Sequence, residues 1–330
     1  MDVEQEIISI LSGYQTTCVL MTANELGLFD ALADQPVSAK KVSSQLNLSL
    51  KGAERLLNAL AAMGIAVKAQ GHYQLQEEWK PFVTRDGERT MNQWIRLVSG
   101  HLETWTRLAE FVRTGEPLRS MMDMLGTDPN KMRTFIDAMH NKALKATWMI
   151  AREIPVGEAT HLLDVGGGPG TYALEWCKLH PHLKATVFDI EPVTKVAETY
   201  IRQYGFQDRV SICAGDFNQG LPDGNYDLIL LANVLHMYDE THAQRLVNKA
   251  AEALLPGGRL IINGLGTEAG QTGPLMDVMF DLNMGMNTEG GRAHPMPDLT
   301  QWLEEAGLGG IRHFRVEAMP PAVVTAIKSR

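Results

Sequence analysis

The chain has 330 residues, of which 45% are hydrophobic and 21% charged, so it can bury a substantial core and is long enough for two domains. Its formal net charge of −9 disfavours binding to nucleic acid or to an anionic membrane, because both need a basic face. The three cysteines, Cys18, Cys177 and Cys213, are widely separated, which predicts neither a disulfide framework nor a zinc cluster and favours a reducing, cytoplasmic location.

The N-terminal residues "MDVEQEIISILSGYQ" are not typical of a signal peptide. They begin acidic, and no basic segment precedes an apolar one. No apolar run of the sequence approaches the roughly 18 residues that a membrane span needs. We therefore expect no membrane partner.

Residues 1–95 are expected to form a small, mostly helical domain. Apolar residues recur at the helical period from about residue 5 to 65, with Ser38 and Ser49 as N-caps of two helices joined by a turn. A short hairpin follows, from "IAVKA" through Gly71 to "HYQL". Two helices followed by a hairpin resemble a winged helix.

A winged helix has two interpretations, DNA binding and a packing or dimerisation module. The second helix of this pair offers Lys51 and Arg55 against Glu54, which is too little positive charge to bind a phosphate backbone. We therefore favour dimerisation and expect no nucleic acid partner.

Residues 96–152 are again helical in pattern and rich in Met and Trp, and we interpret them as linking helices. In residues 153–330 the pattern changes to strand-like apolar runs that alternate with helices. Such alternation predicts a largely parallel, doubly wound sheet with helices on both faces, that is, a Rossmann-like α/β domain. Seven strands are expected, in "HLLDVG", "KATVFDI", "VSICAGD", "YDLILLANVL", "GRLIING", "IRHFRVEAM" and "AVVTAIK", the last two paired antiparallel at the sheet edge.

Four glycines follow the first of these strands, in "HLLDVGGGPGTYALEW". Glycines at the carboxyl end of a parallel strand allow a ligand to approach the backbone, whereas a tight turn alone needs one or two. The dinucleotide pattern Gly-x-Gly-x-x-Gly puts Thr171 at its third glycine, but Gly-x-Gly-x-Gly fits at Gly166, Gly168 and Gly170. That pattern, preceded by Asp164, resembles the first motif of the class I methyltransferases that use S-adenosylmethionine.

Two further strand ends agree with a nucleoside ligand. Asp189 ends the second strand, where a carboxylate can accept hydrogen bonds from both ribose hydroxyls. Asp216 and Phe217 follow the third strand, where a carboxylate can receive the adenine amino group and an aromatic ring can cover the base. A solvated loop is the alternative for Asp189 alone, but three strand ends in agreement favour a cofactor site.

His236 follows the fourth strand, in "LANVLHMYDETHAQRL", just before a helix that Asp239 or Thr241 can cap. Methyl transfer from a sulfonium is an in-line displacement, so an enzyme must align the acceptor and remove its proton. An imidazole, whose ordinary pKa is about 6.5, can take that proton near neutral pH. We interpret His236 as the general base; the alternative is an ordinary surface or core histidine.

The motifs together are similar to those of the acetylserotonin and caffeic acid O-methyltransferase family and its many bacterial members. The resemblance lies in "LLDVGGGPG", "FDIEPV", "AGDFNQGLP", "LANVLHMYDETHAQRLVNKAAEALLPGGRLII" and "LTQWLEEAGL", and with the N-terminal domain it spans nearly the whole chain. It implies a winged-helix dimerisation domain, hence a homodimer, and a methyltransferase sheet that binds S-adenosylmethionine and releases S-adenosylhomocysteine. The family's cofactor residues fall on Gly166, Asp189, Asp216 and Phe217, and its catalytic base falls on His236.

Three positions depart from that family's pattern. Met237 stands where members commonly have the Asp of "HDW", and Ala232 stands where the plant enzymes have a lysine. Ala293 lies near the position of the acidic residue that helps to orient the base. The sequence leaves open which residue takes that orienting role: Glu289, His294 or Asp281.

The acceptor pocket is a hypothesis from the same resemblance. The segment "FIDAMHNKA" resembles the helix that places a Met against the acceptor, which nominates Phe135 and Met139. A second wall is expected from "LMDVMFDLNMGM", in particular Met279, Phe280 and Asn283. Methionine adapts to irregular apolar pockets, and ordinary core packing is the alternative for each.

The sequence therefore predicts an enzyme that moves a methyl group to a hydroxyl of a small, mostly apolar acceptor, without a metal. Three alternatives remain open. The first is an S-, N- or C-methyltransferase of the same fold, and a thiol acceptor would need less help from a base. The second is a relative that binds the cofactor but catalyses other chemistry, and the third is a winged-helix regulator with a ligand-sensing domain. The expected organisation is a dimerisation domain in 1–95, linking helices in 96–152 that contribute to the acceptor pocket, and a cofactor-binding catalytic domain in 153–330.

Overall fold

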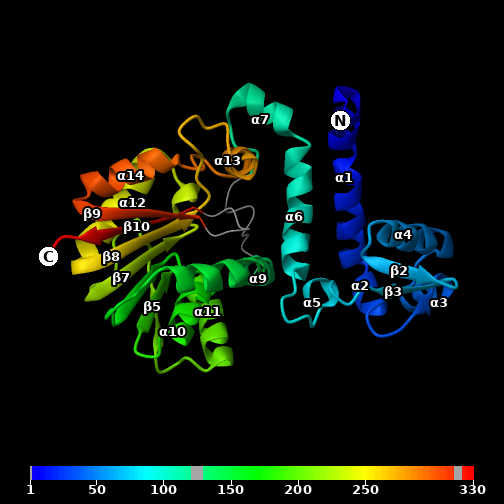
Figure 1. Ribbon diagram of the computed structural model, residues 1–330, viewed down its shortest axis with the longest axis horizontal. Helices are drawn as coiled ribbons and strands as arrows, with labels where there is room; N and C mark the ends of the chain where they lie inside the picture. Colours follow the sequence, from blue (N-terminus) through cyan, green and yellow to red (C-terminus); the bar gives the residue numbers. More distant parts are fainter. Residues whose placement is uncertain (1, 120–128, 316–321) are drawn as a thin grey trace. The chain divides into compact units, whose positions relative to one another are not determined.

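The computed structural model describes residues 2–119, 129–315 and 322–330 (Figure 1). The chain divides into two compact units, residues 1–102 and 103–330, and helix α6 (Asn92–Trp105) spans the boundary between them. Within the described residues, no helix is both long and apolar enough to cross a membrane.

The helices of the first unit begin where the sequence predicts. The Oγ atoms of Ser38 and Ser49 each accept a hydrogen bond from the backbone N–H of the third helical residue, and so act as N-caps of α3 (Ala39–Gln45) and α4 (Leu50–Ala62). Both predicted caps are therefore confirmed. The other helices of this unit are α1 (Val3–Glu25), α2 (Leu28–Ala31) and α5 (Lys80–Val83).

The predicted hairpin of the first unit is present as β2 (Ala66–Ala69) and β3 (His72–Leu75), which pair antiparallel on either side of Gly71. A further strand, β1 (Val37–Ser38), pairs with β3 on its other side. The sequence does not reveal β1, because two residues are too few to form a periodic pattern.

In the second unit, seven strands of the described residues form one sheet in the order β6-β5-β4-β7-β8-β10-β9. The first five strands of that order run parallel, and β10 pairs antiparallel with both β8 and β9. The doubly wound sheet and its antiparallel edge hairpin are thus confirmed. The bounds are β4 (His161–Val165), β5 (Lys184–Asp189), β6 (Val210–Ala214), β7 (Tyr226–Ala232), β8 (Leu254–Gly264), β9 (Leu308–Arg315) and β10 (Ala322–Lys328).

Helices cover both faces of this sheet (Figure 1). Leu162 and Leu163 are adjacent in β4 but belong to different core clusters, because successive strand residues point to opposite faces. One cluster includes residues of α9 (Pro129–Glu153), α10 (Thr171–Leu179) and α11 (Glu191–Tyr204); the other includes residues of α12 (Glu240–Ala253) and α14 (Met296–Glu305). The unit also contains α7 (Leu108–Thr114), the 3₁₀ turn η1 (Leu235–Met237) and α13 (Leu275–Asn287).

The strand order locates the ligand crevice. From β4 the chain moves outward to β5 and β6 on one side, and β7 and β8 then continue the sheet on the other side. The order therefore reverses between β4 and β7, and in sheets of this kind ligands bind outside the carboxyl ends of the strands at such a point.

Arg209 holds the connection between α10 and β5. Its Nη1 donates to the carbonyl oxygens of Cys177 at 2.7 Å and Pro181 at 3.1 Å, and it lies 3.2 Å from that of His180. Cys177 lies in the last turn of α10 and His180 and Pro181 follow the helix, so their carbonyl groups have no N–H partner inside it. A single guanidinium thus fixes the point from which β5 starts.

We expect Arg209→Met to lower the free energy of unfolding by about 1–3 kcal/mol, because it leaves these carbonyl groups without their charged donor. Chemical denaturation of the purified protein measures the change. Arg202→Met is the matched control, since Arg202 forms an exposed pair with Glu198 that is worth about 0.3–0.5 kcal/mol. Equal losses in the two variants would contradict the capping role.

Candidate active site

The loop after β4 has a backbone that requires glycine. Gly166, Gly168 and Gly170 have φ angles of +64°, +56° and +75°, in the left-handed region that side chains disfavour. Gly167 is needed for a different reason, since a Cβ there would lie 2.9 Å from Cγ of Asp164. A Cβ on Gly168 would meet no atom within 4 Å, so the space beside this backbone can admit a ligand.

Asp189 connects the end of β5 to that loop. Its Oδ2 accepts a hydrogen bond from the backbone N–H of Gly168 at 2.9 Å, and its Oδ1 accepts one from Ile190 at 2.7 Å. The pKa of Asp189 is raised, because the effect of burial exceeds the lowering by these two hydrogen bonds. An ionised carboxylate has about four acceptor positions, so two remain for ligand hydroxyls.

The segment after β6 lies against the same loop. The backbone N–H of Gly215 donates to the carbonyl oxygen of Asp189 at 3.0 Å, which joins the two strand ends. Asp216 accepts from the N–H of Asn218 through Oδ1 at 2.8 Å. The buried ring of Phe217 reaches within 3.6 Å of the point that a Cβ on Gly166 would occupy. The structure therefore brings the predicted cofactor residues together.

This arrangement fits an adenosyl group with an amino-acid tail. Asp189 and Asp216 can accept from hydroxyl and amino groups, Phe217 offers an apolar ring, and Gly168 leaves room beside the backbone. Asp164 is fully buried beneath the loop, and burial raises its pKa to about 7. Its Oδ2 accepts from Ala173 at 3.3 Å, whereas its Oδ1 has no hydrogen-bond partner among the described residues.

His236 lies in η1, between β7 and α12, and the predicted N-cap Asp239 begins α12. Its imidazole packs edge-on against Phe280, with ring centroids 4.8 Å apart. Burial lowers the pKa of His236 to about 3, and the positive charge of Lys142 contributes to the same shift. His236 is therefore neutral near pH 7, which is the form that a base requires.

The three residues proposed to orient His236 form no hydrogen bond with its ring in the described part of the chain. Asp281 accepts from the backbone N–H of Ala293 at 2.7 Å, Glu289 is exposed, and Nε2 of His294 lies 3.0 Å from the carbonyl oxygen of Leu235. Among the described residues, no carboxylate forms a hydrogen bond with the His236 ring. The His294 contact holds the backbone beside His236, and the ring has no acidic hydrogen-bond partner in the part of the chain that the structure describes.

The acceptor residues occupy two helices. Phe280 on α13 contacts His236, whereas its neighbour Met279 has 44% of its surface exposed. Asn283 is partly buried on α13, and Phe135 and Met139 are partly buried on α9. The structure thus joins Phe280 to the base directly and leaves the other four on the surrounding helices.

Lys142 is a charged residue of the site that the sequence predictions did not include. Its charge acts on His236, and burial lowers its own pKa. The signal was available, because Lys142 follows Met139 and Phe135 at the i+3 and i+7 spacing of one helix face.

His140 anchors α9 to the glycine loop and was also not predicted. Its Nδ1 lies 2.7 Å from Oγ1 of Thr171, the first residue of α10, and its Nε2 lies 3.2 Å from the hydroxyl of Tyr204 on α11. Burial lowers the pKa of His140 to about 4, so the ring is neutral. Its partners are 31 and 64 positions away in the sequence, so no local sequence pattern predicts these contacts.

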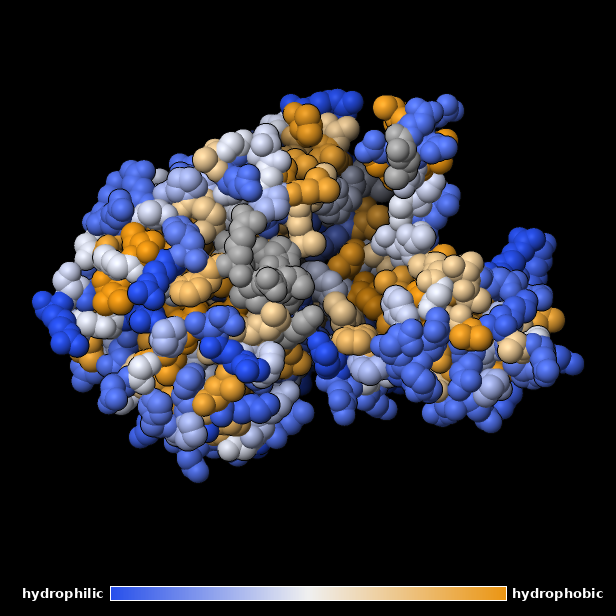
Figure 2. All heavy atoms as spheres, viewed as in Figure 1, coloured by the Kyte–Doolittle hydropathy of each residue, from blue (hydrophilic) through white to orange (hydrophobic). Residues whose placement is uncertain are grey.

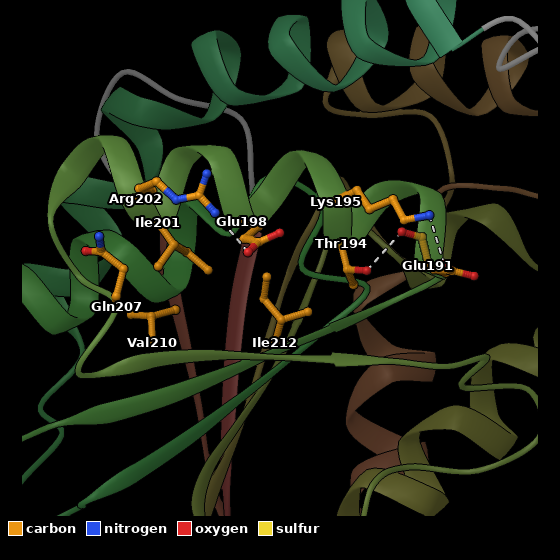
Figure 3. A pocket seen from close by; sticks show the side chains of 9 residues that line it. All are labelled: Glu191, Thr194, Lys195, Glu198, Ile201, Arg202, Gln207, Val210 and Ile212. Carbon is orange, nitrogen blue, oxygen red and sulfur yellow. Dashed lines mark hydrogen bonds and ion pairs between the residues drawn. The ribbon is translucent and has the colours of Figure 1, made fainter.

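The structure also has a surface hollow whose lining residues do not include those of the strand ends described above. It has a volume of about 440 Å³ and lies between α11 and β6 at the sheet edge (Figure 3). Figure 3 shows that charged side chains of α11 border it, and Lys195 and Arg202 there are paired with Glu191 and Glu198. None of the predicted site residues lines it, so we assign the site to the strand ends.

The described residues contain no group of three or more His, Cys, Asp and Glu side chains that could hold a metal ion.

Gly291 allows the segment after α13 to approach the base. The backbone N–H of Arg292 donates to the carbonyl oxygen of His236 at 3.0 Å, and a Cβ on Gly291 would lie 2.5 Å from that oxygen. Neither the carbonyl oxygen of His236 nor the N–H of Arg292 can move away without disturbing η1. Gly291 is thus required for the position of His236.

We expect Gly291→Ala to lower kcat by about 10-fold or more, because a shift of about 1 Å in a catalytic group can cost 100-fold. Steady-state kinetics with a methyl acceptor, together with thermal melts, measure this. Gly220→Ala is the control, since a Cβ on Gly220 would meet nothing within 4 Å. Unchanged turnover in the Gly291 variant would contradict the close approach.

Known proteins share this architecture. The family model of the O-methyltransferase domain matches residues 105–308, and that of the O-methyltransferase dimerisation domain matches residues 8–80. The 3-hydroxy-5-methyl-1-naphthoate 3-O-methyltransferase of Streptomyces sahachiroi is 28% identical over 98% of this chain and 95% of that protein. The N,N-dimethyltransferase OxyT of Streptomyces rimosus is 26% identical over 92% of this chain and 90% of that protein.

Among solved structures, human N-acetylserotonin methyltransferase in complex with SAM has the same fold. Its TM-score is 0.91 with 22% sequence identity, and the match covers 100% of this chain and 99% of that one. Because the O-methyltransferase domain model matches more than half of the chain, and the dimerisation model matches its N-terminal part, the chain belongs to the family of S-adenosylmethionine-dependent O-methyltransferases.

Proposed function

We propose that this methyltransferase acts on an acidic, phenol-type hydroxyl of a small, mostly apolar molecule, with His236 as the general base. The observation that supports this most is the neutral, partly buried imidazole of His236 beside the strand ends that fit an adenosyl group. The hydroxynaphthoate 3-O-methyltransferase of Streptomyces sahachiroi is named for an acceptor of this class.

The bound cofactor supplies a methyl group on a sulfonium whose sulfur leaves neutral. We propose that Gly166, Gly168 and Gly170 bring the backbone close to it. Asp189 accepts hydrogen bonds from the ribose hydroxyls, and the neighbouring Asp216 and Phe217 bind the adenine, the first by accepting from its amino group and the second by covering its face.

His236 takes the hydroxyl proton of the acceptor as the new carbon–oxygen bond forms. An imidazole whose pKa is as low as about 3 is a weak base, so a hydroxyl that ionises readily is a better acceptor than an aliphatic alcohol. A phenol has a pKa of about 10. The positive charge of Lys142 near His236 stabilises the negative charge that develops on the acceptor oxygen.

The acceptor pocket is proposed to lie between the linking helices of residues 96–152 and the strand ends of the catalytic domain, 153–330. Phe280 contributes the wall nearest to His236. The remaining proposed lining residues are Phe135, Met139, Met279 and Asn283.

A nitrogen acceptor is the second candidate, and the N,N-dimethyltransferase name of the OxyT relative favours it. A neutral amine already has a free electron pair, so it needs less help from a base. Screening acceptors with labelled cofactor, followed by mass spectrometry of the product, separates the two.

We also propose that residues 1–95 form a homodimer, in the cytoplasm, where the three free cysteines stay reduced. The first half of α1 exposes apolar side chains at helical spacing, and Figure 2 shows hydrophobic atoms among hydrophilic ones on this helix. Val3, Ile7, Ile10 and Tyr14 are 68%, 52%, 72% and 60% exposed. A stripe of this kind is typical of a partner surface.

His236→Ala is expected to lower kcat by about 100-fold or more with nearly unchanged cofactor affinity, because a general base contributes about 10²–10⁴-fold. Asp189→Ala is the reciprocal variant and should weaken cofactor binding first. Equilibrium dialysis with labelled cofactor and steady-state kinetics measure both. In wild type, kcat/KM should show no acid-side inflection near pH 6.5, because the lowered pKa keeps His236 neutral in more acidic solution.

Full turnover by the His236 variant would refute its role as base, and unchanged cofactor affinity in the Asp189 variant would refute the ribose contact. An acid-side inflection at pH 6.5 that persists in His236→Ala would point to another base.

Replacing Ile7 and Leu11 together by Glu should convert the dimer to a monomer, because each charge would be desolvated in the interface. Light scattering coupled to size exclusion measures the mass. Gln5→Glu adds a charge on another side of α1 and serves as the control. A double variant that remains dimeric would place the interface elsewhere.

A further inference from the structure

The turn formed by Asn233 and Val234, between β7 and η1, leads the chain directly to His236. Asn233 has a φ angle of +56°, in the left-handed region of the backbone. Only glycine, and less often asparagine, adopts this region routinely, and residues held there cluster at functional sites. His236 follows three positions later, inside η1. The conformation of the turn therefore sets the position of His236.

A closed ring of three hydrogen bonds holds this turn. Nδ2 of Asn233 donates to the hydroxyl of Tyr172 at 3.2 Å, and Nδ2 of Asn263 on β8 donates to the same hydroxyl at 2.6 Å. The backbone N–H of Asn233 donates in turn to the carbonyl oxygen of Asn263 at 2.7 Å. Each of the three residues thus contacts the other two, which ties Asn233 to both α10 and β8.

Tyr172, the acceptor of two of these hydrogen bonds, is fixed in the core. It is the second residue of α10, whose N-cap is Gly170, the last glycine of the loop after β4. Only 7% of its surface is exposed, and its side chain belongs to the core cluster that includes residues of α9 and α10. Burial raises the pKa of its hydroxyl to about 12, so the hydroxyl is uncharged at neutral pH and can accept from both amides.

The glycine loop lies against the same turn from another side. Cγ2 of Val234 is 3.1 Å from the point that a Cβ on Gly166 would occupy. Gly166 begins the loop that is proposed to meet the cofactor, and Tyr172 stands in the helix that follows the end of this loop. Both ends of the loop are therefore next to the turn that precedes His236.

We propose that Tyr172 is a positioning residue for the base: through its hydrogen bond from Asn233 it fixes His236 relative to a cofactor bound at the glycine loop. The inference rests on the proposed role of His236 in removing the acceptor proton. That proton passes to His236 alone, and Tyr172 and Asn233 only set the distance and angle of the transfer. A base must lie within hydrogen-bond reach of the proton that it removes, so a displaced turn slows the reaction.

Hydrogen exchange of the full-length protein with S-adenosylhomocysteine tests the tie without any need for turnover. The N–H of Met237 donates to the carbonyl oxygen of Val234 at 3.2 Å, so its exchange reports how firmly the turn is held. Tyr172→Phe and Asn233→Gly should each exchange this N–H about 2–10-fold faster than wild type, the factor that corresponds to one lost hydrogen bond. Unchanged exchange in both folded variants would overturn the proposal.

Steady-state kinetics with a hydroxynaphthoate as methyl acceptor test the consequence for the base. Tyr172→Phe and Asn233→Gly should each lower kcat by about 10-fold or more, with cofactor affinity within about twofold of wild type. Glycine keeps the left-handed backbone and removes only the amide, so wild-type kcat in Asn233→Gly would mean that backbone conformation alone matters. The double variant should lose no more than either single one, because both changes remove the same hydrogen bond. Losses that multiply would contradict the proposal.

Tyr226→Phe is the matched control. Tyr226 is 3% exposed and begins β7 at the end opposite to Asn233, where its hydroxyl donates to the carbonyl oxygen of Asp223 at 3.4 Å. Its loss should change neither the exchange of the turn nor kcat, and a loss of kcat equal to that of Tyr172→Phe would point to a general structural effect. Failure of the proposed function would show in His236→Ala, as full turnover, so the two failures are distinguishable.

Discussion

Parallel pairing of β4 with β5 on one side and β7 on the other is the constraint on which the site depends. It brings the glycine loop, Asp189 and His236 to one edge of the sheet, although more than 60 positions separate the first from the last in the sequence. The connections from β4 to β5, from β5 to β6 and from β7 to β8 each return through a helix, namely α10, α11 and α12. The hydrogen bond from Gly168 to Asp189 then joins two of these ends directly.

Burial sets the chemistry at the fourth strand end. The same apolar packing that holds His236 against Phe280 lowers the pKa of its imidazole to about 3. The ring is therefore neutral throughout the neutral range, but it is only a weak base, because no carboxylate of the described residues forms a hydrogen bond with it. We propose that acceptor acidity and the charge of Lys142 are two ways in which this chain compensates.

Local chemistry made much of the fold predictable. Strand periodicity, the caps at Ser38, Ser49 and Asp239 and the hairpin at Gly71 depend on residues close in sequence, and the structure has all of them. The glycine pattern after β4 and the acidic residue that ends β5 can likewise be located from the sequence around them. The bond of Asn263 to Tyr172 and that of His140 to Thr171 join residues 91 and 31 positions apart, and neither spacing has a signature. Such partners appear only when the sheet and its helices assemble.

The central claim is that adjacent strand ends form a binding site for an adenosyl group. Isothermal titration of S-adenosylhomocysteine into the purified protein tests it most directly, because binding needs neither an acceptor nor turnover. One site per chain with micromolar or tighter affinity is expected. No detectable binding by correctly folded protein would contradict the assignment of these strand ends, and with it the roles given to every residue around them.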